Sequence, residues 1–266
     1  METVGDERLA RAVEEIAREI GGTVGVAVRD VRGQRALDYR ADEVFPSASV
    51  IKVPILVELM AQVDEGLRAL DDRLVLRDAD KTPGSGVLSM LHEGLELTLE
   101  DLAHLMITVS DNTASNLLID LLGVDRINAR LASLGLERTR LGRKFYDFDA
   151  RDRGLENWAT AGELAELLVG IELRAVISGP ACEKMLAILR RQQFDSKITR
   201  LLPPGTPVAN KTGSITGVSH DIGIIYSPAG PLVLAVLTRD VDEPAVAEGG
   251  IRHIARAVYG NWGQPS

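Results

Sequence analysis

The sequence has a single cysteine, Cys182, among its 266 residues. One thiol excludes an intramolecular disulfide and a cluster of thiolate metal ligands. The four histidines are scattered, with no His-x-x-x-His or comparable ligand spacing. We therefore expect no metal site.

Long apolar runs and a positive net charge are also missing. No stretch of about 18 apolar residues occurs, so we expect no membrane span. The net charge of −9 argues against nucleic acid or an anionic membrane surface as a partner. The first 20 residues carry charges throughout and lack the apolar core of a signal peptide. As written, the chain is expected to be cytoplasmic; if a leader has been removed, it would be periplasmic or secreted.

What is present is a globular composition, with 45% apolar and 26% charged residues. Apolar periodicity predicts an opening helix, two strands around the turn at 30–33, a long helical stretch, three strands and a closing helix. The expected terminal elements are helices over 6–20 and 247–259 and strands over 23–29, 34–40, 206–212, 220–227 and 232–239. The expected inner helices cover 49–65, 88–91, 98–108, 113–122, 124–134, 161–171, 179–191 and 197–201.

This order predicts an α/β (α+β) protein with two lobes. One antiparallel sheet would be built from both chain ends and flanked by helices, in a lobe made of residues 1–44 and 203–266. An all-helical lobe, residues 45–202, would be inserted between them. A substrate pocket is expected in the cleft between the lobes.

The first motif is Ser49-Val50-Ile51-Lys52. Its serine and lysine are three residues apart, so on a helix they share one face. A serine hydroxyl needs a base within reach to act as a nucleophile, and a lysine whose pKa is lowered can be that base. Alone, the motif is more often a helix start with a capping serine and a solvated lysine.

The second motif is Ser110-Asp111-Asn112, between an apolar run and a helix. By itself it would be a turn or helix cap. In a cleft, Ser110 could relay a proton to a leaving group, and Asn112 could bind a substrate amide.

The third motif, Lys211-Thr212-Gly213-Ser214, is expected at the end of a strand. It would otherwise be a strand end with a glycine turn. In a cleft, Lys211 would lower the pKa of Lys52 and attract a substrate carboxylate. Thr212 and Ser214 could hold that carboxylate, and Gly213 lets a substrate backbone approach closely.

Ser-x-x-Lys, Ser-Asp-Asn and Lys-Thr-Gly in this order are the motifs of class A β-lactamases and penicillin-binding proteins. The chain resembles that superfamily over essentially its whole length, and is most similar to class A. The resemblance implies a serine hydrolase that opens a β-lactam amide through an acyl-enzyme on Ser49, with Lys52 as base or relay. Ser110 and Lys211 would deliver a proton to the leaving nitrogen, and the backbone N–H groups of Ser49 and Ser214 would form the oxyanion hole.

The same resemblance implies no metal or organic cofactor. It implies a small-molecule partner, either a β-lactam or an amide or ester of an acylated D-amino acid. We expect the enzyme to be a monomer.

One loop departs from the class A pattern. Class A enzymes carry roughly Arg-x-Glu-Pro-x-x-Asn, whose glutamate activates the water that releases the acyl group. Here Arg143 is followed by Lys144 and Phe145, so phenylalanine stands in place of the glutamate. Asp147 and Asp149 are candidate replacements, or they are solvated or paired with nearby arginines.

Because the glutamate is missing, three functions remain possible. A class A β-lactamase with weak deacylation is the first hypothesis. A D-alanyl-D-alanine peptidase or esterase on the same scaffold is the second, and a penicillin-binding acyl trap without turnover is the third.

Overall fold

The computed structural model describes residues 4–32 and 35–265. A five-stranded sheet has the order β2-β1-β9-β8-β7, and each neighbouring pair is antiparallel. Its strands are β1 (Thr23–Asp30), β2 (Ala36–Tyr39), β7 (Val208–Ile215), β8 (Val218–Ser227) and β9 (Gly230–Arg239). The sheet is therefore built from both chain ends, which confirms the predicted fold class. Gly33 and Gln34, where the turn was expected to end and the second strand to begin, lie outside the described residues.

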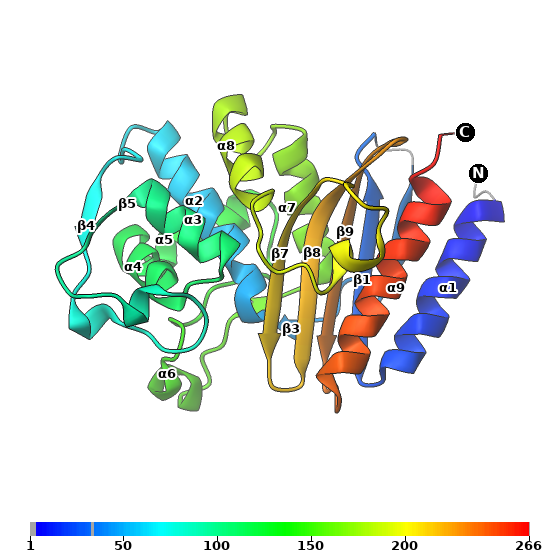
Figure 1. Ribbon diagram of the computed structural model, residues 1–266, viewed down its shortest axis with the longest axis horizontal. Helices are drawn as coiled ribbons and strands as arrows, with labels where there is room; N and C mark the ends of the chain where they lie inside the picture. The colour runs from blue at the N-terminus through cyan, green and yellow to red at the C-terminus, as the bar shows by residue number, and fades with distance from the viewer. Residues whose placement is uncertain (1–3, 33–34, 266) are drawn as a thin grey trace.

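The two terminal helices, α1 (Val4–Ile20) and α9 (Pro244–Trp262), lie side by side on one face of the sheet (Figure 1). They bury an apolar stripe that includes Leu9 and Val13 of α1 and Ile254 of α9 against strand residues such as Val26 and Val236. The helical period of 3.6 and the strand period of 2 thus direct apolar side chains of the helices and of the strands into the same layer between them.

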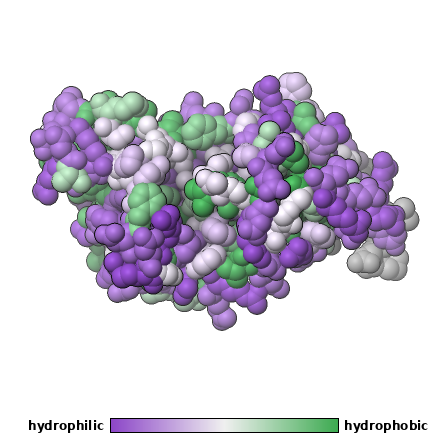
Figure 2. All heavy atoms as spheres, turned by 90° about the horizontal axis from the view of Figure 1, so that it is seen from below, coloured by the Kyte–Doolittle hydropathy of each residue, from purple (hydrophilic) through white to green (hydrophobic). Residues whose placement is uncertain are grey.

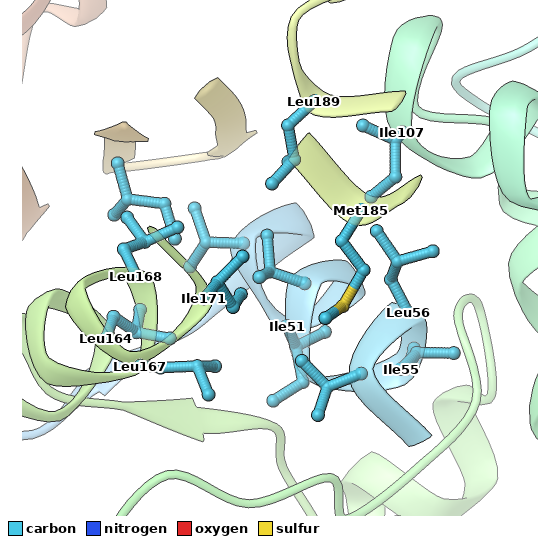
Figure 3. Close-up of a cluster of buried hydrophobic side chains, with 14 of the residues drawn as sticks. Ile51, Ile55, Leu56, Ile107, Leu164, Leu167, Leu168, Ile171, Met185 and Leu189 are labelled. Atoms are coloured by element: carbon cyan, nitrogen blue, oxygen red, sulfur yellow. The ribbon is translucent and has the colours of Figure 1, made fainter. Parts of the chain in front are cut away.

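Helices from the middle of the chain lie on the other side of the sheet (Figure 1). These are α2 (Lys52–Asp64), α3 (Leu99–Thr108), α4 (Asn112–Leu122), α5 (Val124–Ser133), α7 (Ala161–Glu172) and α8 (Gly179–Leu189). Side chains from α2, α3, α7 and α8 meet in one cluster (Figure 3). This core continues into the sheet through Ile222 and Leu237, and α7 contacts β1 and β9. The residue bounds of the two lobes stay a prediction.

Helix α2 lies at the centre of the helical layer. Every residue from Lys52 to Gln62 is buried, which is typical of a helix enclosed on all sides. The N-terminal end of α2 carries the first motif, so the core holds that end in place.

The sequence did not predict several short elements. Two small sheets pair β3 (Phe45–Pro46) with β6 (Trp158–Ala159), and β4 (Arg73–Val75) with β5 (Glu96–Thr98). The charged stretch 143–159 contains α6 (Phe148–Asp152), and a 3-10 helix, η2 (Asp78–Asp80), lies outside the expected helices. The helices expected over 88–91 and 197–201 are present as the 3-10 helices η3 (Leu88–Met90) and η4 (Ile198–Leu201), and the helix expected over 49–65 begins with the 3-10 helix η1 (Ala48–Ile51). Strand β7 runs on to Ile215, so the third motif lies within a strand and not at its end.

Hydrophilic residues cover most of the face drawn in Figure 2, with hydrophobic residues in small groups. Among the residues described, no helix is both long enough and apolar enough to cross a bilayer.

Candidate active site

Ser49 lies in a strained turn between β3 and α2. Ala48 has a φ of 44°, in the left-handed region that a side chain disfavours. The turn is held at its start by a hydrogen bond of 2.8 Å from the Ser47 N–H to the carbonyl oxygen of Asn157. Ser49 sits in the 3-10 helix η1, where side chains three residues apart eclipse each other. This geometry directs Ser49 and Lys52 to the same side.

The Lys52 ammonium group is fully buried, with 0% of the residue exposed. Its Nζ donates to the carbonyl oxygen of Ser110 at 2.7 Å, to Ser110 Oγ at 3.1 Å and to Asn112 Oδ1 at 2.9 Å. Burial, and next the charge of Lys211, lower the pKa of Lys52 well below its ordinary value. A buried lysine with a lowered pKa can hold a neutral amine that accepts a proton.

Ser110 connects the first motif to the third. Its Oγ lies 3.1 Å from Lys52 Nζ and 3.1 Å from Lys211 Nζ. Ser110 has a φ of 56°, and the following Asp111 caps α4 by accepting from the Ala114 N–H. The Asp111 carboxylate also accepts from the backbone N–H groups of Val87 and Leu88, so the whole corner is fixed.

Lys211 is buried in β7, the edge strand that faces the turn at Ser49. Its Nζ donates to the carbonyl oxygen of Thr212 at 2.7 Å, and burial lowers its pKa to about 7. Gly213 lies so close to the turn that a Cβ added there would be 3.1 Å from the Ser49 nitrogen. The missing side chain at Gly213 therefore allows β7 and the turn to approach each other.

A cavity of about 250 Å³ opens where these segments meet. Its lining includes residues from all three motifs together with Ser85, Phe194, Ser196 and Glu248; the motif residues are Ser49, Ser110, Thr212, Gly213 and Ser214. Asn112 is also buried beside this group through its bond to Lys52, but it does not line the cavity. The structure thus brings together the predicted catalytic and substrate-binding residues.

Lys197 also lines this cavity, and sequence reasoning missed it. Only 2% of the residue is exposed, and Nζ donates to the carbonyl oxygens of Gly213 and His220, each at 3.0 Å, and to Ser214 Oγ at 2.8 Å. Burial lowers the pKa of Lys197. No motif surrounds this lysine, and only the fold brings it to β7, so the sequence held no signal that would have found it.

The loop that departs from the class A pattern is closed at its base. Asn157 Oδ1 accepts from the backbone N–H groups of Gly142 and Arg143, and the Arg143 guanidinium pairs with Glu156 at 2.9 Å. Asn116 then holds Phe145 through both backbone groups, at 2.9 Å and 3.0 Å. These bonds fix the main chain at Phe145.

The two candidate acids of this loop lie beyond Phe145. Asp147 caps α6 by accepting from the Ala150 N–H at 2.9 Å, and Asp149 is exposed in α6. Neither lines the cavity at Ser49. Their role as deacylation bases stays a prediction.

Within residues 4–32 and 35–265, no group of three or more His, Cys, Asp or Glu side chains is placed to hold a metal ion.

Known proteins resemble this chain over nearly its full length. The family model described as the beta-lactamase enzyme family matches residues 8–262. A beta-lactamase from Sphaerobacter thermophilus has a structure with a TM-score of 0.88 and 41% identity, covering 97% of this chain and 98% of that one.

Two further relatives are informative. A mutant of PBP-A, described as an acyl-enzyme complex with penicillin G, has a TM-score of 0.86 and 31% identity, covering 96% of each chain. The extended-spectrum beta-lactamase PER-1 of Pseudomonas aeruginosa is 28% identical, covering 94% of this chain and 86% of that protein.

Proposed function

This chain belongs to the beta-lactamase enzyme family, and we propose that Ser49 is its acylated nucleophile and Lys52 the base that activates it. The chain is a class A β-lactamase-like hydrolase that acts on the β-lactam amide bond. The proposal for its residues depends on one observation: Ser110 Oγ is within hydrogen-bond distance of both Lys52 Nζ and Lys211 Nζ.

In acylation, the neutral Lys52 amine takes the proton of the Ser49 hydroxyl, and the Ser49 oxygen attacks the lactam carbonyl carbon. Burial lowers the pKa of Lys52, which favours the neutral amine that this transfer needs. Backbone N–H groups of Ser49 and Ser214 stabilise the developing oxyanion, each contributing about 3 kcal/mol.

Collapse of the tetrahedral intermediate breaks the bond to the lactam nitrogen, which must gain a proton as it leaves. Ser110 lies between the two ammonium groups and is placed to donate its hydroxyl proton and regain one from Lys52 or Lys211. The two lysines thus support one proton path from the nucleophile to the leaving group.

Substrate recognition combines charge and amide contacts. Lys211 and Lys197 place positive charge beside Thr212 and Ser214, which favours a substrate carboxylate there. Asn112, fixed by Lys52, is the proposed partner of the substrate acylamide. Gly213 leaves room for the substrate backbone.

Deacylation is proposed to be slow. Phe145 occupies the position of the class A glutamate, and its ring covers the Lys52 ammonium group at 4.3 Å. A hydrocarbon ring cannot accept the proton of an attacking water, and general-base help is typically worth 10²–10⁴-fold.

The same observation favours a second candidate function. A D-alanyl-D-alanine peptidase or esterase uses the same three motifs without that glutamate. Such an enzyme would release a peptide or ester acyl group while β-lactams persist as an acyl-enzyme. In the limiting case, the chain is an acyl trap for β-lactams.

One experiment separates these functions. The protein is mixed with a chromogenic cephalosporin while both colour and intact mass are followed. Sustained colour supports a β-lactamase, and one equivalent of colour with a lasting mass increase on Ser49 supports slow deacylation. Neither signal would direct the search to peptide and ester substrates. Ser49→Ala should abolish the adduct, and an adduct that persists in this variant overturns Ser49 as the nucleophile.

A further inference from the structure

His220 is fully buried in β8, with 0% of the residue exposed, and none of the three motifs contains it. Its Nδ1 lies 3.0 Å from the backbone nitrogen of Thr238, and its Nε2 lies 2.8 Å from the carbonyl oxygen of Pro46. Because the Thr238 N–H can only donate, Nδ1 must be the unprotonated acceptor. Nε2 therefore carries the proton and donates it to Pro46.

This tautomer makes the imidazole a bridge between the sheet and the segment before the nucleophile. Pro46 lies three residues ahead of Ser49, and Phe45 packs its ring edge-on against His220 with 6.3 Å between ring centroids. Burial lowers the pKa of His220 to about 4, so the neutral ring that this bridge needs is the form present near neutral pH.

The turn at Ser49 is therefore held from two sides. The carbonyl oxygen of Asn157 holds Ser47 from the loop, and the His220 ring holds Pro46 from the sheet. Between these two bonds and Ser49 stands Ala48, in its left-handed conformation. A strained residue keeps its conformation only where the surrounding structure fixes it.

The position of this turn decides where the Ser49 N–H points. Gly213 of β7 is in contact with the turn, close to the Ser49 nitrogen, so any shift of the turn changes the space between Ser49 and Ser214. Those two N–H groups are the proposed oxyanion hole, and displacement by about 1 Å can cost 10²-fold in rate. The main chain of His220 belongs to the same framework, since its carbonyl oxygen accepts from Lys197.

We propose that His220 is a positioning residue for acylation: through Nε2 it fixes Pro46, and thereby the distance between Ser49 and the edge strand β7. The inference rests on the proposed role of Ser49. It assigns to His220 no contact with substrate and no proton transfer.

Two substitutions separate this role from simple packing. In His220→Asn, the side-chain oxygen stands near the place of Nδ1 and can accept from Thr238, but nothing reaches Pro46. In His220→Gln, the longer amide can donate to Pro46 from near the place of Nε2. Both remove the ring beside Phe45, so both lose a similar amount of packing.

The measurements are the acylation rate constant and the dissociation constant of intact chromogenic cephalosporin, from stopped-flow bursts and intact mass. His220→Asn should acylate about 10–100-fold more slowly with the dissociation constant unchanged, and His220→Gln should stay within about threefold of wild type. Circular dichroism melts check that both variants fold. If His220→Asn does not fold, His220→Phe replaces it, because it fills the space without a bond to Pro46.

Acylation by His220→Asn within twofold of wild type overturns the inference. An equal loss in the Asn and Gln variants also overturns it, since packing alone would then explain the effect. If the wild-type protein forms no adduct on Ser49, the proposed function fails together with this inference. If the wild type forms the adduct and only the variants disagree with the expectation, the inference about His220 fails alone.

Discussion

The ring of Phe145 lies over the Lys52 ammonium group, with Nζ 4.3 Å from the ring centroid. A cation over an aromatic face is attracted to it, which favours the charged amine, whereas burial is the largest influence and favours the neutral one. The residue that we predict in place of the family's glutamate is thus in contact with the proposed base.

Phe145→Glu should therefore speed deacylation. A carboxylate at this place can accept a proton from the attacking water, so the penicilloyl or cephalosporoyl adduct should decay about 10²–10⁴-fold faster. The decay is measured by intact mass after excess β-lactam is removed. The side-chain amide of Asn116 bonds the backbone N–H and carbonyl oxygen of residue 145, which any residue there retains. The substitution should therefore leave the loop in place.

Phe145→Gln is the matched control, because a glutamine side chain has the length of a glutamate and is polar, but its amide cannot act as a base. It should leave the adduct lifetime within a few-fold of wild type. Equal acceleration by Gln and Glu would mean that removal of the ring, and not the carboxylate, opens the ester to water.

Ser110→Ala tests the proton path. The substitution removes the oxygen that stands between Lys52 Nζ and Lys211 Nζ, so acylation should slow by about 10²-fold or more while substrate affinity changes little. Stopped-flow bursts measure both quantities. Ser115→Ala is a suitable control, since Ser115 is equally buried but donates only to the Asp111 carbonyl oxygen. A similar loss in the two variants would refute a special role for Ser110.

Periodicity was enough to predict the terminal helices, the five strands and most inner helices, because long amphipathic segments carry a clear pattern. It could not predict β3 with β6 or β4 with β5, since pairs of two or three residues depend on tertiary contacts and not on local sequence. The spacing of Ser49 and Lys52 predicted that they share a side, and the resemblance of the three motifs to the family's predicted that Ser110 and Lys211 would meet them.

Two features of the site could not be predicted in that way. Lys197 reaches the site only because η4 packs beside β8 and α9, a contact between segments far apart in the chain. The stacking of Phe145 on Lys52 depends equally on how Asn116 places the loop.

Lys197→Met should weaken the binding of substrates that carry a carboxylate. A hydrogen bond to a charged group is worth about 1.5–3 kcal/mol, which corresponds to an increase of about 10–100-fold in KM. Lys197→Arg keeps the charge and should recover part of the loss. The measurement compares a β-lactam carboxylate with its methyl ester.

The methyl ester is the control for a structural effect. Lys197 also donates to the carbonyl oxygens of Gly213 and His220, so Lys197→Met loses these contacts as well. The methyl ester should show a change of less than about threefold. An equal rise in KM for acid and ester would mean that Lys197 acts on the shape of β7 and not on the substrate's charge.

The pH dependence of acylation should reveal Lys211. Its pKa is lowered to about 7 by burial, so the ammonium form exists below that pH and is lost above it. Because kcat/KM reports groups of the free enzyme, its value for a carboxylate substrate should fall as pH rises through about 7. Lys52 acts with the opposite sign, since it must lose its proton to serve as base and its pKa is lowered by burial. Lys211→Arg, charged throughout this range, should be slower but should lack the falling limb, and a methyl ester substrate should show a weaker one. A fall of the same size in the Arg variant would mean that another group titrates, and Lys211 would then have no part in holding the substrate's charge.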